Sequence, residues 1–197
     1  DPGDYLDDLK RWQVTQPPAA QKAAIDRHLG HWRDALAHLA ELPDDDAFSE
    51  ALRLAREKGL LRHAMQLFKD DAARYASVMA AYAESLSTRN LHEDAALAWL
   101  AAGEREAALS SYQEAGEWRQ ALALAHALGW NTEKIKKLAA NLAEDMRGNM
   151  TPVHAATLHL EYLKDVDGAV ALFAQAQAWR DALWTAQRFE RQDLVKT

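Results

Sequence analysis

The chain has 197 residues, a net charge of −7 and no cysteine. The lack of cysteine excludes disulfide bonds and thiolate metal sites and fits an intracellular protein, while an acidic chain is not an obvious nucleic-acid binder. No apolar run approaches the roughly 20 residues that a bilayer-spanning helix needs, and because the chain begins at Asp1 without a methionine we expect a segment of a longer protein.

The composition favours an all-α protein. Hydrophobic residues make up 49% of the chain, and many of them are alanine. Alanine is the best helix former because it has little side-chain entropy to lose. Glycine, proline and β-branched residues are few, so we predict helices joined by short turns around a buried core.

Apolar residues at helical spacing, separated by turn-forming residues, predict the individual helices. Asp4 can cap the first helix, and Pro17 ends it. Gly30 and Gly59 are good left-handed terminators, and the acidic run that begins at Asp44 can cap the helix after it. The predicted helices after the first occupy residues 18–29, 32–42, 46–58, 60–69, 71–89 and 132–147, with a further start at Thr151.

The most regular stretch is marked by alanines at a constant spacing. Ala95, Ala108 and Ala121 are each 13 residues apart, and the same step separates Ala169 from Ala182. Thirteen residues hold one helix of about ten residues and a tight turn. Counting these short helices, we expect about thirteen helices in all.

A five-residue motif recurs along the chain. Trp-Arg-Asp-Ala-Leu occupies residues 32–36 and 179–183, and Trp-Arg-Gln-Ala-Leu occupies residues 118–122. Four weaker copies keep the alanine followed by an apolar or small residue. Internal repetition of this kind indicates a repeat protein, in which each unit stacks on its neighbours.

These repeats predict an all-α solenoid. We expect residues 1–197 to form a single α-solenoid segment of short antiparallel helix pairs, similar to tetratricopeptide repeats but with shortened helices. One possible subdivision separates regular helix hairpins in residues 1–130 from a second set of helical repeats in residues 131–197.

Each residue of the motif has a structural interpretation. Alanine lets two helix axes approach to the short end of the usual separation of about 8–10 Å, and the leucine fills the adjacent layer. The tryptophan lies on the same helix face and can close the hairpin, a burial that contributes roughly 2–3 kcal/mol, while we expect the arginine to point outward. The predicted structural anchors are Trp32, Ala35, Ala64, Ala95, Ala108, Trp118, Ala121, Ala169, Trp179 and Ala182.

No arrangement of residues suggests catalysis or cofactor binding. The eight histidines include no His-Glu-x-x-His motif, and Gly30 separates His28 from His31. Ser110 and Ser111 lack the flanking glycines of a nucleophile elbow, and no glycine-rich phosphate loop is present. We therefore predict that the chain is not an enzyme and holds neither a metal nor a cofactor.

The one basic cluster consists of Lys134, Lys136, Lys137 and Arg147, next to Trp130. It could contact RNA or an acidic partner. Alternatively, it is the solvent-exposed face of an amphipathic helix whose apolar residues point inward. We favour the second interpretation and keep the first as an alternative.

The order of the repeats resembles a known family. Residues 80–130 contain an alanine-rich helix with a polar end, the pattern x-Glu-x-Ala-Ala-Leu, and two repeats that follow Gly103 and Gly116, the second with a tryptophan before its Ala-Leu. This order resembles the helical-repeat region of the largest subunit of the Elongator complex. Residues 25–39 and the start of the chain at Asp1 are similar to the same region.

The resemblance implies a function in a large assembly. Elongator contains two copies of each subunit and modifies the wobble uridine of certain transfer RNAs, with the chemistry in a different subunit. The largest subunit is the scaffold, and it also carries propellers, a basic segment that contacts transfer RNA and a dimerisation region. The resemblance therefore implies a scaffold segment of this subunit in the cytoplasm, with a nuclear location left open.

The expected partners follow from the same resemblance. They are the other Elongator subunits, and a homodimer of the full-length subunit is possible. Transfer RNA would be contacted mainly by segments outside this chain, and no membrane is involved. Two alternatives stay open: a solenoid of the vesicle-coat or intraflagellar-transport type, and a direct RNA-binding module built on Lys134, Lys136 and Lys137. A metal-dependent enzyme is a remote third alternative.

Overall fold

The computed structural model describes residues 18–148 and 151–195. Over these residues the chain forms twelve α-helices, a π-helical turn and a 3-10 turn, and no strand. The predicted all-α class with helix pairs is therefore confirmed. The helix expected near Asp4 lies outside the described residues, as does its end at Pro17.

The chain divides into two compact units, residues 1–104 and residues 105–197. This boundary differs from the possible subdivision after residue 130. The reason is that the helices on either side of residue 130 pack against each other within the second unit. That residues 1–197 act as one continuous segment stays a prediction.

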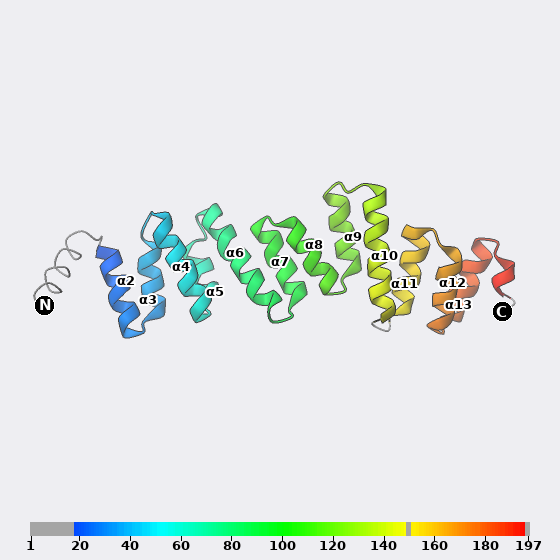
Figure 1. Ribbon diagram of the computed structural model, residues 1–197, viewed down its shortest axis with the longest axis horizontal. Coiled ribbons are helices and arrows are strands. Elements are labelled where there is room, and N and C mark those ends of the chain that lie inside the picture. Colours follow the sequence, from blue (N-terminus) through cyan, green and yellow to red (C-terminus); the bar gives the residue numbers. More distant parts are fainter. Residues whose placement is uncertain (1–17, 149–150, 196–197) are drawn as a thin grey trace, which may run out of the picture. The chain divides into compact units, whose positions relative to one another are not determined.

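The first unit is a stack of helices in which each contacts the next along the chain (Figure 1). Additional contacts join α3 to α5 and α4 to α6, so the helices form two layers, as expected for stacked helix pairs. The helices of this unit are α2 (Pro18–Leu29), α3 (Trp32–Ala40), α4 (Asp45–Lys58), α5 (Leu61–Leu67), α6 (Ala72–Ser87) and α7 (His92–Ala102).

Local capping chemistry sets the helix ends in this unit. Asp44 precedes α4, and its Oδ1 accepts a hydrogen bond of 2.6 Å from the backbone N–H of Ala47. Asp71 caps α6 in the same way, because its carboxylate accepts from two backbone N–H groups. α4 ends at Gly59, whose φ of 67° lies in the left-handed region where glycine is favoured.

The second unit also stacks consecutive helices, from α8 to α13. Pro152 stands in the first turn of its helix, as expected from its missing N–H group. The elements are α8 (Arg105–Glu114), α9 (Trp118–Ala127), α10 (Thr132–Gly148), α11 (Pro152–Leu158), the π-helical turn η1 (His159–Leu163), α12 (Val166–Gln175), α13 (Trp179–Arg188) and the 3-10 turn η2 (Gln192–Val195).

The π-helical turn η1 was not predicted from the sequence. It leads through Lys164, which has a φ of 59°, to Asp165 at the start of α12. Asp165 Oδ1 accepts a hydrogen bond of 3.0 Å from the N–H of Gly168, while its Oδ2 lies 2.9 Å from His159 Nδ1. A Cβ atom at Gly168 would lie 2.1 Å from Asp165 Oδ2, so glycine leaves the space that the carboxylate occupies.

Candidate functional site

The alanines of the repeat lie in the helix contacts. Six of the seven predicted alanine anchors are completely buried, and Ala182 is 6% exposed. Because a methyl group is the whole side chain, these positions allow close approach of neighbouring helix backbones. The completely buried alanines are Ala35, Ala64, Ala95, Ala108, Ala121 and Ala169.

The three tryptophans of the motif have different surroundings. Trp118 is buried, and its ring lies 6.0 Å from the ring of His154 on α11. Trp32 is half-buried beneath the ammonium group of Lys58, 4.1 Å from the ring centre. Trp179, by contrast, is 61% exposed, which differs from the expectation that each tryptophan closes a hairpin. Among the described residues, α13 is followed only by the short turn η2, so no longer helix covers this ring.

The exposed tryptophan belongs to an apolar groove on α12 and α13. Leu183, the motif leucine of α13, is 45% exposed, whereas its counterparts Leu36 and Leu122 are buried. Trp179 and Leu183 line a groove of about 490 Å³ together with Val170 of α12. Sequence reasoning missed this groove because the leucine of the motif is buried in the other two copies.

The structure separates the predicted basic cluster into different environments. Lys134, Lys136 and Lys137 are all exposed on α10, while apolar residues of that helix are buried, as expected for an amphipathic helix. Lys134 and Lys137 line a groove of about 240 Å³ with Trp130. Lys136 lies outside that lining and has its Nζ 3.6 Å from a Glu133 carboxylate oxygen.

Arg147, the remaining member of the cluster, takes no part in this groove. Its guanidinium lies 3.1 Å from Glu144 near the opposite end of α10. At the groove, the ammonium nitrogen of Lys134 is 5.9 Å from the centre of the Trp130 ring. The structure therefore brings together one aromatic ring and two of the three predicted lysines.

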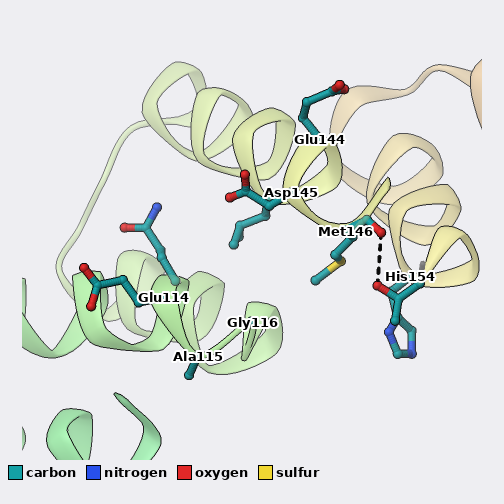
Figure 2. A pocket seen from close by; sticks show the side chains of 10 residues that line it. Glu114, Ala115, Gly116, Glu144, Asp145, Met146 and His154 are labelled. Atoms are coloured by element: carbon teal, nitrogen blue, oxygen red, sulfur yellow. Dashed lines mark hydrogen bonds between the residues drawn. The ribbon is translucent and has the colours of Figure 1, made fainter. Parts of the chain in front are cut away.

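One pocket of the second unit lies where α8 and α10 end (Figure 2). It has a volume of about 710 Å³. Figure 2 shows Glu114 on one wall and Glu144, Asp145 and Met146 on the facing helix. We call this the acidic pocket and define it by Glu114, Glu144 and Asp145 around an apolar floor of Leu142 and Met146. Sequence reasoning missed it because its walls lie about thirty positions apart along the chain.

The part of the chain that the structure describes has no side-chain arrangement typical of a metal site. Within residues 18–148 and 151–195, no group of three or more histidine, aspartate or glutamate side chains is placed to hold a metal ion. In the same part of the chain, no helix is long and apolar enough to cross a bilayer. The prediction that the chain is not an enzyme and binds no cofactor stays a prediction.

The contacts of Asp165 with His159 of η1 and with Gly168 of α12 change its pKa. The N–H of Gly168 and the ring of His159 both stabilise the ionised carboxylate, so they hold the pKa of Asp165 below its usual range. Asp165 is therefore a charged cap at the start of α12. Asp165 therefore has a structural role, because it caps a helix and contacts one histidine. This role involves no catalytic chemistry.

Comparison with known proteins gives a consistent result over nearly the whole chain. A family model described as ELP1 TPR domain matches residues 20–183. Elongator complex protein 1 of Mus musculus is 32% identical over 200 aligned residues that cover the whole chain and 15% of the relative. The proteins of the same name from Saccharomyces cerevisiae and Arabidopsis thaliana are 30% and 27% identical, covering 100% and 94% of the chain and 14% of each relative. The chain thus spans about 15% of the length of the curated relatives it matches.

Proposed function

Because the chain belongs to the ELP1 TPR domain family, we propose that it is a non-catalytic scaffold segment of an Elongator complex. In this role it supports assembly of the machinery that modifies the wobble uridine of transfer RNAs. The observation that carries the proposal is the family match over residues 20–183. The proposed partners are the other Elongator subunits, and the proposed location is the cytoplasm, with the nucleus left open.

The construction of each unit supports a scaffold role. Stacked helix pairs contact mainly their neighbours and present surface area along the stack, which suits the simultaneous binding of other chains. The completely buried alanines keep neighbouring helices close together. The proposal includes no catalytic residue, and it assigns most of the contact with transfer RNA to segments outside this chain. A homodimer of the full-length subunit is compatible with it.

Affinity purification of the full-length protein tests the proposal. The tagged protein with residues 18–195 deleted is compared with the intact protein in cells that lack the untagged copy. We expect the deletion to reduce recovery of the other Elongator subunits and to lower wobble-uridine modification in cellular transfer RNA. An intact protein that recovers subunits of a vesicle coat or of intraflagellar transport instead would overturn the assignment.

Direct RNA contact is the second candidate function, and the groove beside Trp130 favours it. Trp130, Lys134 and Lys137 line the groove together with the amide side chains of Gln113 and Asn141. An aromatic ring next to cations suits an unpaired base and its phosphate, and amides can bond to base edges. The acidic net charge of the chain opposes such binding, so this function ranks second.

A gel-shift titration with transfer RNA at several salt concentrations tests RNA contact. If the groove binds RNA, replacing Lys134 and Lys137 by alanine should weaken binding and reduce its salt dependence. Lys136→Ala is the matched control, because Lys136 lies on the same helix but outside the groove lining. Equal losses from Lys136→Ala and from the two groove lysines would mean that the groove is not the binding site.

A further inference from the structure

Thr151 is an exposed threonine directly followed by a proline. No other serine or threonine of the 197-residue sequence precedes a proline. Proline has no backbone N–H, and protein kinases whose substrate cleft gives that N–H no acceptor select proline directly after the residue that they phosphorylate. Thr151 stands before α11 with a non-helical φ of −116°. Its hydroxyl is therefore at the one position in the sequence that fits a proline-directed protein kinase.

The contacts of the Thr151 hydroxyl determine what its phosphorylation would change. The hydroxyl donates a hydrogen bond of 3.2 Å to the carbonyl of Met146 near the end of α10. The backbone N–H of Thr151 donates to the same carbonyl at 3.0 Å. A phosphorylated oxygen has no proton to donate, so the hydroxyl bond is lost while the carbonyl keeps its backbone donor. Phosphorylation therefore does not leave the Met146 carbonyl unsatisfied.

Thr151 lines two pockets of different charge. The first is the acidic pocket, where it stands with Glu144 and Asp145. The second has a volume of about 500 Å³, and Arg147 and Gln175 contribute to its lining. We call it the arginine pocket, and no aspartate or glutamate lines it among the residues that the structure describes. Because carboxylates repel a phosphate and a guanidinium attracts it, the arginine pocket is the favourable one of the two.

The arginine pocket offers hydrogen-bond donors from three helices. Arg147 lies in the last turn of α10, His154 in the first turn of α11, and Gln175 at the end of α12. Arg147 Nη1 is 3.1 Å from a Glu144 carboxylate oxygen, and both side chains of this pair are at least half exposed. A guanidinium carries five N–H groups in a fork, so Arg147 can bind a phosphate oxygen while it keeps Glu144. The imidazole of His154 and the amide of Gln175 can add neutral donors.

We propose that Thr151 is a phosphorylation site and that the arginine pocket receives its phosphoryl group. A proline-directed protein kinase transfers the γ-phosphoryl group of ATP to the hydroxyl oxygen of Thr151. The bond between the γ-phosphorus and the bridging oxygen of ATP breaks, ADP leaves, and the hydroxyl proton passes to a base of the kinase. The phosphate then joins the start of α11 to the ends of α10 and α12, which is a regulatory contact beyond the scaffold role.

Incubation of the purified 197-residue chain with Mg²⁺, ATP and either a cyclin-dependent or a mitogen-activated protein kinase tests the site. Mass spectrometry should find one phosphoryl group per chain and locate it on Thr151. Pro152→Ala should nearly abolish the reaction, because it keeps the acceptor hydroxyl and adds a backbone N–H. Thr132→Ala is the matched control and should leave the rate unchanged, since Thr132 is also exposed at a helix start but precedes Glu133.

Several outcomes of the kinase reaction would overturn the proposal. These are no phosphate on Thr151 with either kinase, phosphate mainly on other residues, or an equal rate for Pro152→Ala. Circular dichroism establishes whether Pro152→Ala is folded. Thr151→Val serves as the second variant, because it removes the acceptor and keeps the proline, and it should leave the chain without phosphate.

Nuclear magnetic resonance of the phosphorylated chain tests which pocket receives the phosphate. In the ¹⁵N-labelled chain, phosphorylation should shift the side-chain amide of Gln175 more than the backbone amides of Glu114 and Ala115, which line only the acidic pocket. In ³¹P spectra, Arg147→Gln should raise the midpoint of phosphate ionisation, ordinarily near about pH 6, because the guanidinium favours the dianion. Arg180→Gln is the control, since Arg180 is exposed in the same unit and lies outside both linings.

These spectra use the 197-residue chain alone, so their result does not depend on the scaffold proposal. If the largest shifts fall at Glu114 and Ala115, the phosphate enters the acidic pocket and the proposal is wrong. It is equally wrong if the ionisation midpoint is the same in Arg147→Gln, in Arg180→Gln and in the intact chain.

Discussion

The guanidinium carbon of Arg74 lies 5.3 Å from the centre of the Phe48 ring. From this position, at the start of α6, the guanidinium also donates hydrogen bonds to backbone carbonyls that follow α3, including one of 2.5 Å to Pro43. Phe48 in turn packs edge-on against Phe68, with the ring centres 5.0 Å apart. Arg74 of α6 thus contacts both the segment that follows α3 and Phe48 of α4.

Arg74→Ala should therefore lower the free energy of unfolding by about 1–3 kcal/mol, because it leaves backbone acceptors without their charged donor. The Arg74 side chain is only 17% exposed, so solvent replaces these bonds poorly. Urea unfolding of the two proteins measures the difference as a shift in midpoint at constant slope. Arg53→Ala is the control, because Arg53 is 64% exposed and forms a surface ion pair with Glu50. Equal midpoints for Arg74→Ala and Arg53→Ala would contradict the proposed role.

A buried alanine anchor should not tolerate a larger side chain. Ala121 on α9 is completely buried, so Ala121→Leu should overpack the helix contact and lower the stability by roughly 1–3 kcal/mol. Ala123→Leu is the matched control, because Ala123 is exposed on the same helix. Thermal unfolding followed by circular dichroism checks both variants. If Ala121→Leu leaves the Tm unchanged, alanine at this position does not serve close helix approach.

Features set by neighbouring residues were predictable from the sequence, whereas features set by distant residues were not. The end of α4 at Gly59 and its cap at Asp44 follow from local backbone chemistry. The burial of Ala108 and Ala121 follows from a regular spacing. The exposure of Trp179 could not be predicted, because the same motif is buried or exposed according to whether a later helix covers it.

The candidate site shows the same division in more detail. Lys134 and Lys137 were identified as a cluster because they are close in sequence and on one helix face. The acidic pocket was missed because Glu114 and Asp145 belong to different helices and come to line the same pocket only after the chain folds. The π-helical turn at His159 was also missed, since a single extra residue within a helical pattern leaves no clear signal in the apolar periodicity.

The charged cap of α12 should make stability depend on acid pH. The pKa of Asp165 is lowered in the folded chain, chiefly by the N–H of Gly168 and then by His159. A carboxyl with a lowered folded-state pKa stabilises the fold above its unfolded pKa of about 3.9 and loses that contribution as the pH falls through the folded value.

Comparison of the intact chain with Asp165→Asn tests this charge directly. Asparagine caps helices about as well as aspartate, so the variant removes the charge and keeps the cap. We expect the intact chain to have the higher Tm at pH 6, and its free energy of unfolding to be higher by less than about 1 kcal/mol because the carboxylate is partly exposed. The difference should shrink as the pH falls below about 4. A difference that stays constant from pH 6 to pH 3 would show that the carboxylate charge is not responsible.

Opposite ends of α10 should respond oppositely to loss of a carboxylate. Glu133 lies in the first turn, where the positive end of the helix dipole favours it, and Asp145 lies in the last turn, where the negative end disfavours it. Asp145→Asn should therefore raise the stability by about 0.3–1 kcal/mol at low ionic strength, while Glu133→Gln should lower it by a similar amount.

Thermal unfolding at about 0.1 M and at about 1 M sodium chloride checks the direction of both stability changes. The Debye length is roughly threefold shorter at the higher concentration, so interactions between charges are screened more strongly there. Both differences should decrease at high salt if they arise from charge. Glu133→Gln also loses the contact of Glu133 with Lys136, so Lys136→Gln is measured separately to subtract that part. A lowered Tm for Asp145→Asn at low salt would mean that Asp145 already has a stabilising partner in the folded chain.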